Sequence, residues 1–285
     1  MQKILGGSYQ IGTNSGVGVP TDLEGPAIQV TINDFLIDSL TVTNQDFLSF
    51  VEATGYVTEA ERLGWSFVFH YFLDEVTKKQ SQTVGGLSWW YGVKKADWRH
   101  PEGANSTITG RMDHPVTQVS RNDAVAYCIW AEKRLPTEAE WEIAAKGGNN
   151  FDQYPWGKEL LINGEHRCNI WQGDFPDNNI HADGFDGTAP AKHYLPNDYG
   201  LYQMIGNVWE WCVNPGRISL ETFNNMDGKT FWKQHQQVDD QYYAIKGGSF
   251  LCHHTYCNRY RIAARNGNTG MSASNNMGFR CVKDI

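Results

Sequence analysis

The chain's most informative segment reads GGSFLCHHTYC and covers residues 247–257. Two thiols, Cys252 and Cys257, stand five positions apart in it, and an arginine-rich run at residues 259–265 follows. Thiolates bind soft ions such as Cu(I) or Zn in preference to hard cations, and nearby arginines favour the thiolate over the thiol. On spacing alone, however, a structural disulfide or two buried free thiols would be the more frequent explanation. The segment therefore poses a choice between a metal–thiolate site and a structural pair.

The composition describes a globular chain that is rich in loops. Its 285 residues are 40% hydrophobic and 20% charged, and they include 11 Trp, 13 Tyr, 13 Phe and 29 Gly. This length can bury a sizeable core, and the many aromatic side chains suggest an irregular backbone held in place by large rings. The net charge of −8 argues against a nucleic-acid partner, because no basic stripe is available to neutralise phosphates.

Targeting signals and cysteine usage narrow the cellular setting. No apolar run is long enough to span a membrane, so no membrane partner is expected. Residues 1–13 lack the charged and apolar regions of a secretory signal, and we therefore expect a cytoplasmic protein. Six cysteines are too few for a disulfide-framework protein of this length.

Three helices are predicted from N-capping residues and apolar periodicity. They begin after Thr43, Ser120 and Thr137, and the first and third end at Gly55 and Gly147. Alternating patterns predict strands at residues 27–32 and 242–245. Almost nothing between residues 146 and 240 has a helical period, which is unusual in a compact domain unless ions and tryptophans hold the loops. We therefore predict a single α+β domain, residues 1–285, with little regular secondary structure.

Five segments together resemble the formylglycine-generating enzyme family, also called the sulfatase-modifying factors. They read RLPTEAEWE (134–142), YPWG (154–157), NIWQG (169–173), GNVWEW (206–211) and the whole of residues 246–281, which ends in GFRC. The resemblance covers nearly the whole chain and implies a C-type-lectin-like fold. Most of these segments mark a wider superfamily that includes non-enzymes. The Gly-Gly-Ser-x-x-Cys-x4-Cys arrangement marks the copper-dependent oxidases within it.

This resemblance implies a specific reaction. Similar enzymes bind Cu(I) between two thiolates, which here are Cys252 and Cys257. The cysteine of an unfolded sulfatase segment, typically Cys-x-Pro-x-Arg, joins as a third sulfur ligand. Molecular oxygen and a reductant then convert that cysteine to Cα-formylglycine, so the chain would be an oxidoreductase that matures sulfatases by post-translational modification. Two soft anionic ligands stabilise Cu(I) and leave coordination positions open.

The resemblance also assigns residues around the substrate. Ser249 would hydrogen-bond near the incoming sulfur or oxygen, Asn276 would contact the peptide, and Trp89 or Trp90 would pack on it. The chain departs from its relatives where the peptide should run. Thr41 replaces a frequent glutamate, and residues 270–273 read GMSA where relatives usually have Pro-Asp-Ser-Ser. Both departures therefore bear on the recognised peptide motif, and neither touches Cys252 or Cys257.

Two structural Ca²⁺ sites are implied as well. The first would use the side chains of Asn169 and Asp183 with the carbonyls of Ile170 and Phe185. The second would use Glu210, the carbonyls of Gly206 and Val208, and Gln203 where relatives commonly have Asn. Hard cations bind several oxygens and accept loop carbonyls readily. The alternative explanation is ordinary turn hydrogen bonding by Asn and Asp.

The remaining cysteines and the two histidines receive simpler interpretations. Cys128 and Cys281 match positions that pair as a disulfide in secreted relatives, and both the disulfide and the free thiols remain open. Cys168 and Cys212 are expected to be buried hydrophobic residues. The adjacent residues 253–254 are not expected to ligate one ion, because neighbours on an extended segment point to opposite sides.

Two rival functions remain. The first is the same thiolate–copper oxidation acting on another cysteine-containing peptide. The second is a catalytically silent, lectin-like binding module that kept the fold. Cys252 and Cys257 discriminate between an enzyme and a module, because a binding module has no need of the pair.

Overall fold

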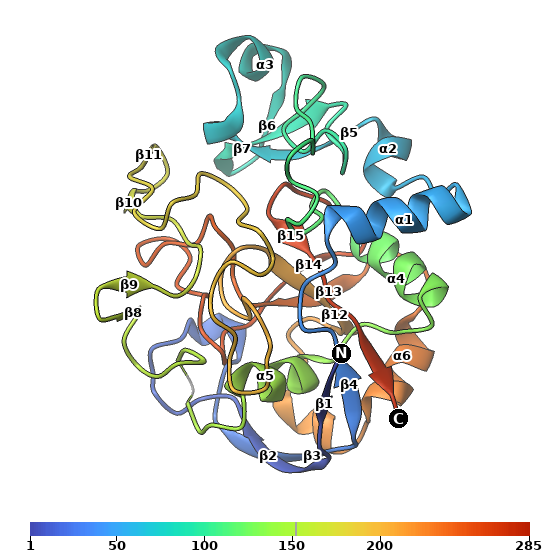
Figure 1. Cartoon of the computed structure of the whole chain (residues 1–285), viewed down its shortest axis with the longest axis vertical. Coiled ribbons are helices and arrows are strands. Elements are labelled where there is room, and N and C mark those ends of the chain that lie inside the picture. The colour runs from blue at the N-terminus through green and yellow to red at the C-terminus, as the bar shows by residue number, and fades with distance from the viewer. Residues whose placement is uncertain (152) are drawn as a thin grey trace.

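A four-stranded sheet lies at the centre of the fold (Figure 1). We describe it from a computed structural model that covers residues 1–151 and 153–285. Its strands, in spatial order, are β14 (Asn266–Thr269), β13 (Tyr242–Lys246), β12 (Trp209–Pro215) and β15 (Met277–Gly278). The β12–β13 and β13–β14 pairs are antiparallel, whereas β15 runs parallel to β12. The strand predicted at residues 242–245 is therefore confirmed as β13.

The three predicted helices are all present, and each begins with the expected cap. They are α1 (Asn44–Thr54), α4 (Arg121–Trp130) and α5 (Glu138–Lys146). Each has a complete capping box, in which the Ser or Thr side chain and the acidic residue three positions later satisfy one another's backbone N–H groups. Gly55 and Gly147 end α1 and α5 in the left-handed conformation, with φ of 68° and 62°.

Other short elements were not predicted. They comprise α2 (Glu59–Leu63), α3 (Glu75–Gln80), α6 (Gly228–His235) and three 3-10 turns at Pro20–Asp22, His70–Phe72 and Leu220–Asn224. Helix α6 lies inside the region expected to lack helices, so that expectation is wrong at this point. Only Gly228 and Phe231 of α6 are buried, and such a short apolar face leaves little periodic signal.

Small sheets surround the central one. At the top of Figure 1, β5 (Trp65–Phe69), β7 (Leu87–Lys94) and β6 (Gln82–Val84) form a three-stranded sheet in that order. At the bottom, β2 (Gly7–Ile11) pairs with β3 (Ile28–Ile32), which confirms the strand predicted at residues 27–32.

Four further pairings complete the strand inventory. Strand β4 (Phe35–Ile37) pairs with both β1 (Gln2–Ile4) and β16 (Val282–Asp284), and this brings the two termini together. Two hairpins, β8 (Leu161–Ile162) with β9 (Glu165–His166) and β10 (Gly173–Asp174) with β11 (Asn178–Asn179), interrupt the long loops.

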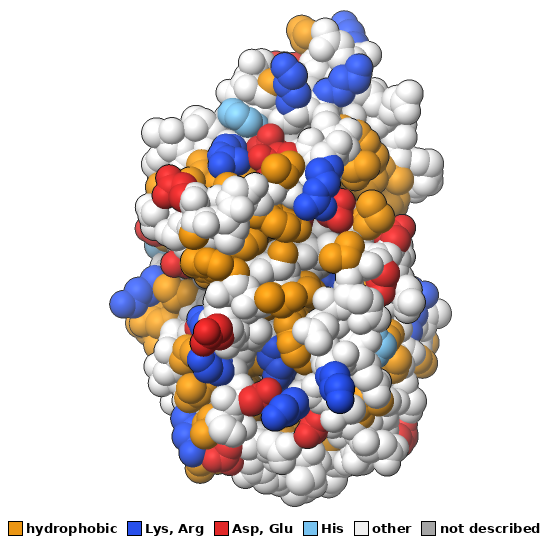
Figure 2. All heavy atoms as spheres, turned by 90° about the vertical axis from the view of Figure 1, so that its right-hand side faces the viewer, with side chains coloured by type: hydrophobic (Ala, Val, Ile, Leu, Met, Phe, Trp, Pro, Cys, Tyr) orange, Lys and Arg blue, Asp and Glu red, His pale blue; other side chains and the backbone are white. Residues whose placement is uncertain are grey.

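Aromatic rings fill the interior, as the composition indicated. Trp98, Trp141 and Trp211 are fully buried in the main core. On the side that carries α1, α4 and α6, acidic and basic side chains are interspersed with apolar ones, and neither charge forms a continuous patch (Figure 2). Among the described residues, no helix is long and apolar enough to cross a bilayer.

Candidate active site

The two thiols of residues 247–257 lie side by side. The Sγ atoms of Cys252 and Cys257 are 2.6 Å apart, and the residues are 1% and 7% exposed. A turn holds them there, because the Cys252 N–H donates to the Ser249 carbonyl at 2.9 Å and the Cys257 N–H donates to the His253 carbonyl at 2.8 Å. Gly248 is required beside this turn, since its φ is 76° and a Cβ atom would lie 2.9 Å from the Cα of Tyr260.

Both thiols line one groove of about 500 Å³. The other side chains predicted from the sequence to act near the substrate line the same groove: Ser249, Asn276, Trp89 and Trp90. Sequence reasoning missed several lining residues, among them Phe175, Tyr256 and Asn268. Phe175 stacks on Tyr256 with ring centroids 4.7 Å apart, and Trp89 meets Tyr256 edge to face at 5.0 Å. One wall is thus aromatic, while amide and hydroxyl groups occupy other positions.

A chain of polar side chains leads to the first thiol. The Ser274 hydroxyl donates to Asn276 Oδ1 at 2.7 Å, and Asn276 Nδ2 donates to Ser249 Oγ at 2.9 Å. A hydrogen bond between the Ser249 side chain and Cys252 acts to lower the pKa of that thiol, although burial outweighs it. These contacts place Ser249 beside the sulfur of Cys252 and connect it to Asn276; the predicted role of Ser249 toward the incoming sulfur stays a prediction.

The two thiols differ in acidity. Burial, followed by the hydrogen bond with Cys257, raises the pKa of Cys252 well above that of an ordinary thiol. The same hydrogen bond lowers the pKa of Cys257, and the nearby Arg259 lowers it further against the effect of burial. Cys257 is therefore the more acidic thiol of the pair.

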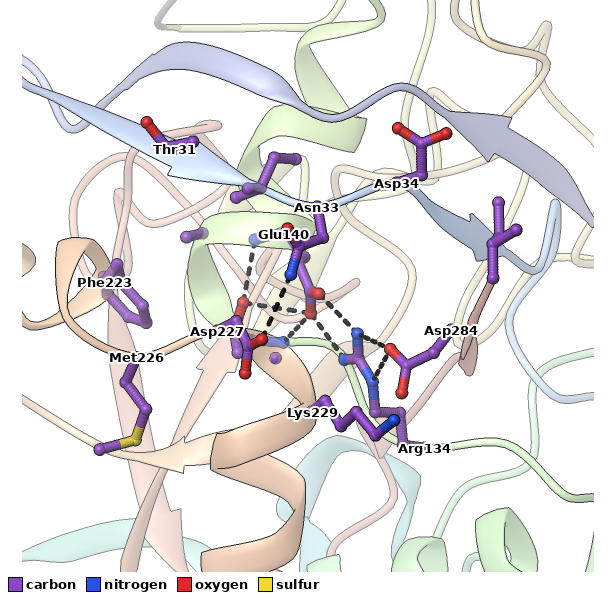
Figure 3. Close-up of a pocket in the computed structure, with 15 residues that line it drawn as sticks. Thr31, Asn33, Asp34, Arg134, Glu140, Phe223, Met226, Asp227, Lys229 and Asp284 are labelled. Atoms are coloured by element: carbon purple, nitrogen blue, oxygen red, sulfur yellow. Dashed lines mark hydrogen bonds and ion pairs between the residues drawn. The ribbon is translucent and has the colours of Figure 1, made fainter.

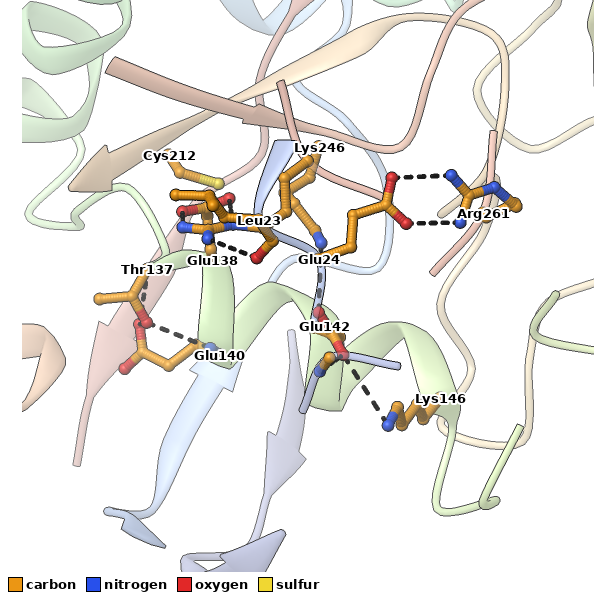
Figure 4. A network of polar contacts seen from close by, with 12 residues as sticks. Leu23, Glu24, Thr137, Glu138, Glu140, Glu142, Lys146, Cys212, Lys246 and Arg261 are labelled. Carbon is orange, nitrogen blue, oxygen red and sulfur yellow. Dashed lines mark hydrogen bonds and ion pairs between the residues drawn. The ribbon is translucent and has the colours of Figure 1, made fainter. Parts of the chain in front are cut away.

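Only one of the three arginines in residues 259–265 lines the groove. Arg259 pairs with the buried carboxylate of Asp22, beside Cys257. Arg261 is bound by Glu24 through contacts of 2.6 and 2.8 Å, as Figure 4 shows. The third, Arg265, is bound by Glu138 at 2.8 and 2.9 Å and also donates to the Leu23 carbonyl.

These ion pairs limit the prediction that every arginine in residues 259–265 favours the thiolate. All three arginines are paired with carboxylates, and Arg259 differs from Arg261 and Arg265 in that it lines the groove at the thiols. Residues 22–24, from the loop before β3, thus hold three arginines of the thiol-bearing segment in place.

The first predicted calcium site contains one buried carboxylate, and the Gln172 amide donates both to it and to the Ile170 carbonyl. Asp183 is 9% exposed and accepts from the N–H groups of Ile170 and Phe185 and from the Gln172 amide. Burial raises its pKa, and no lysine or arginine among the described residues pairs with it. A buried carboxylate without a cationic partner fits a bound cation. Asn169 lies on the same loop, where its amide donates to the Gly187 carbonyl.

The second predicted calcium site does not fit. Both oxygens of Glu210 are bound by Arg280, at 2.6 and 2.7 Å, and Trp141 Nε1 donates to one of them. The carboxylate charge is therefore neutralised by an arginine, which would repel a divalent ion. The Gln203 amide donates to the Pro190 carbonyl, and its buried Oε1 has no partner in the described parts of the protein. The remaining members, Gly206 and Val208, lie in the turn before β12.

The other cysteines and the two histidines lie outside the groove. Cys168 and Cys212 are buried, as predicted, and Cys128 and Cys281 are free thiols with Sγ atoms 3.5 Å apart. The expectation that residues 253–254 point to opposite sides is wrong, because they begin a turn and their rings lie 4.0 Å apart. Neither ring lines the groove.

The chain matches one protein family over its whole length. The family described as "Sulfatase-modifying factor enzyme 1-like domain" matches residues 1–285. The chain is 49% identical to a formylglycine-generating enzyme of Thermomonospora curvata, over 100% of this chain and 93% of that protein. It is 48% identical to one of Mus musculus, over 100% and 75%. A Bos taurus relative named inactive C-alpha-formylglycine-generating enzyme 2 is 43% identical, over 99% and 87%.

Two solved structures share the fold. PvdO from Pseudomonas aeruginosa aligns with a TM-score of 0.67 at 22% identity, over 99% of this chain and 93% of its own. Treponema denticola variable protein 1 aligns with a TM-score of 0.61 at 18% identity, over 100% and 95%. At these identities the likeness concerns the architecture alone.

Proposed function

The chain belongs to the sulfatase-modifying factor family, and we propose that it converts a cysteine in a Cys-x-Pro-x-Arg segment of a sulfatase to Cα-formylglycine. Several relatives are named for formylglycine generation, which supports this conversion. Family membership alone does not decide activity, because a relative 43% identical is named inactive. The observation that carries the proposal is the contact between Cys252 and Cys257 in the wall of a groove.

The proposed cofactor is Cu(I), held by Cys252 and Cys257. Two thiolates are the soft donors that this ion prefers. Among the described residues, no third His, Cys, Asp or Glu side chain joins them. A coordination position is therefore left for the thiol of the substrate, which the groove can admit.

The proposed chemistry balances with oxygen as the oxidant. The CβH₂–SH group loses two electrons as it becomes an aldehyde, and its sulfur leaves as hydrogen sulfide. Oxygen accepts these two electrons and, with two protons, two more electrons from a reductant, and it leaves as two molecules of water. Hydrolysis of the resulting thioaldehyde supplies the aldehyde oxygen and releases the hydrogen sulfide. The bound copper would supply the electron transfer between thiol and oxygen.

The chain's own side chains would position the thiols and orient the peptide. Ser249, held by Asn276, donates to Cys252 and fixes the position of that sulfur. Arg259 places a positive charge beside Cys257, which would offset the negative charge of a metal bound by several thiolates. The aromatic wall would pack on the peptide and limit the entry of water.

A structural Ca²⁺ at the first loop site is a further part of the proposal. It would bind the side chains of Asn169 and Asp183 and the carbonyls of Ile170 and Phe185. The uncompensated charge of Asp183 supports this assignment. We do not propose an ion at the second set, since Arg280 occupies the carboxylate of Glu210.

The test is a conversion assay. Copper-loaded protein is incubated with oxygen, a reductant and a peptide that contains Cys-Thr-Pro-Ser-Arg, and mass spectrometry follows the replacement of the thiol by an aldehyde. Cys252→Ser and Cys257→Ser should abolish conversion, whereas Cys168→Ala, which removes a buried thiol outside the groove, is the matched control.

Three other outcomes separate the alternatives. A peptide that binds but is never converted would favour a lectin-like binding module. A peptide that neither binds nor reacts would point to a different cysteine-containing substrate. Conversion that persists in both thiol variants would refute the metal–thiolate assignment.

A further inference from the structure

A second cavity of about 490 Å³ adjoins the thiol groove. It lies on the sheet formed by β5, β7 and β6, at the top of Figure 1. The cavity and the groove share two lining residues, Phe67 and Val84. The cavity and the groove are therefore direct neighbours, and Phe67 and Val84 border both. We call it the flank cavity; its other lining residues are Trp65, Gln80, Gln82, Thr83, Gly92 and Lys94.

Trp65 is the main apolar surface of the flank cavity. It is 37% exposed. Trp65 and Phe67 are two positions apart on β5 and so face the same side of the sheet. Their rings meet edge to face with centroids 5.0 Å apart. Gly92 on β7 makes room for the indole, since a Cβ atom there would lie 3.2 Å from Trp65 Cε3. The indole is thus held as a fixed wall.

The flank cavity is structurally coupled to the thiols. Phe67 pairs with the segment around Ser274, because the Phe67 N–H donates to the Ala273 carbonyl at 3.4 Å and the Asn275 N–H donates to the Phe67 carbonyl at 3.2 Å. Ser274 begins the polar chain that reaches Cys252 through Asn276 and Ser249. The wall from Trp65 to the first thiol is therefore continuous.

Charge decides what the flank cavity can accept. The described residues that line it and the groove include two charged side chains, Lys94 and Arg259, and no carboxylate. A cationic side chain would therefore find no ion-pair partner and would meet Lys94. An anionic one would have Lys94 as its nearest partner, at the exposed end of β7. An apolar side chain would bury its surface against Trp65 and Phe67, which is favourable without any partner.

We propose that the flank cavity binds an apolar side chain of the substrate polypeptide, located outside the Cys-x-Pro-x-Arg segment, and that Trp65 determines this specificity. The inference rests on the proposed function and extends it to the residues that flank the reacting cysteine. Burial of a leucine side chain against a partly exposed wall recovers part of its full transfer free energy. We expect a tenfold gain in affinity, which corresponds to 1.4 kcal/mol.

The experiment uses peptides with a common core. Cys-Thr-Pro-Ser-Arg is extended by three residues on the amino or the carboxyl side, and the extensions are leucine-rich, lysine-rich, glutamate-rich or Gly-Ser. KM is measured with the copper-loaded enzyme, and Kd is measured with the same peptides carrying serine in place of the cysteine. A leucine-rich extension on one side should lower both constants about tenfold relative to Gly-Ser. Lysine-rich and glutamate-rich extensions should not.

Variants locate the effect. In Trp65→Ala the ratio between the leucine-rich and Gly-Ser peptides should fall to about one, and Trp65→Phe should keep part of it. Trp130→Ala is the matched control, because Trp130 is similarly exposed at the end of α4 and lines neither cavity. A gain that survives in Trp65→Ala, no gain on either side, or a preference for lysine or glutamate would overturn the inference.

The experiment can refute the specificity inference and the proposed function independently. If the Gly-Ser peptide is converted and the leucine-rich peptide shows no advantage, the specificity inference fails and the proposed function stands. If no peptide yields an aldehyde, the proposed function fails, and the Kd ratios obtained with the serine peptides still decide whether Trp65 binds an apolar flank.

Discussion

Glu24→Gln tests whether a buried ion pair anchors the thiol-bearing segment. Glu24 and Arg261 are 237 positions apart, and their side chains are 4% and 3% exposed. Two contacts of 2.6 and 2.8 Å join them, and the Glu24 carbonyl also accepts the Thr13 N–H at 2.9 Å. The pair fastens the loop before β3 to the segment that carries Cys257.

The expected cost follows from the charge left behind. Removal of one partner of a buried pair typically costs about 3–5 kcal/mol, because the other charge stays buried without compensation. Glutamine keeps one acceptor oxygen for Arg261, so we expect about 3 kcal/mol. Domains of this kind are stabilised by about 5–15 kcal/mol in total. The double variant Glu24→Gln/Arg261→Met should be more stable than the sum of the single effects predicts, because it leaves no unpaired guanidinium.

Urea unfolding followed by tryptophan fluorescence measures these effects, since fully buried tryptophans report on loss of the core. Asp34→Asn is the matched control. Asp34 pairs with Lys3 at 2.8 Å, and both side chains are largely open to solvent, at 43% and 49% exposed; the loss of this pair should leave the unfolding midpoint nearly unchanged. A cost below about 1 kcal/mol for Glu24→Gln, or strict additivity in the double variant, would refute the anchoring argument.

Four other perturbations address the site. Cys252→Ser and Cys257→Ser should each abolish aldehyde formation and, because both side chains are buried, lower the free energy of unfolding by about 1–2 kcal/mol; residual conversion in either would count against the copper pair. Arg259→Met should weaken Cu(I) binding about tenfold in competition with a chromophoric chelator, and should slow alkylation of Cys257 at neutral pH, because the arginine lowers the pKa of that thiol; equal affinity would contradict its role. Asp183→Asn should lower Tm in calcium buffer to the value that the parent protein shows with a strong chelator, and a parent Tm indifferent to chelation would exclude the ion. Burial raises the pKa of Glu138, but the buried Arg265 beside it lowers the pKa by more, so that the net pKa lies below the ordinary glutamate value. Its stabilisation is thus present above that range and is lost as pH falls through the lowered pKa, so Glu138→Gln should flatten the acid limb of a stability–pH curve.

Local signals in the sequence predicted the helices well. The caps at Thr43, Ser120 and Thr137 and the stops at Gly55 and Gly147 all lie where the capping pattern indicated. Each cap is satisfied by groups within a few residues, so a short stretch of sequence contains the whole signal. The C-type-lectin-like α+β architecture was predicted from the family resemblance and agrees with the solved neighbours.

Features that depend on distant partners could not be predicted. The small sheet of β5, β7 and β6 and the short helix α6 gain their stability mainly from tertiary packing, which leaves weak periodicity. The ion pair between Asp22 and Arg259 joins positions 237 apart, and the sequence around neither residue predicts it. The same holds for Arg280, which binds the Glu210 carboxylate expected at the second calcium site.

The site itself was predictable in its reactive groups and less so in its surroundings. Cys252, Cys257, Ser249 and Asn276 belong to one recognisable segment, and the structure gathers them around one groove. The aromatic wall was only partly foreseen, because Phe175 belongs to a remote loop whose sequence gives no sign of its position. The two thiols, Ser249 and Asn276 cluster in the sequence here, whereas the other residues that shape the groove come from several elements.

The surroundings of the thiols argue for chemistry at sulfur more strongly than the thiols alone do. Two cysteines needed only for stability would be served by a disulfide or by apolar packing, and neither requires a nearby charge. Here Arg259 lies at Cys257 and is itself held by a buried carboxylate, Asp22. Burial of that ion pair carries a desolvation cost that packing alone does not require. An arginine held beside one member of a thiol pair, at the wall of an open groove, is explained by the need to maintain a thiolate where a guest molecule can reach it.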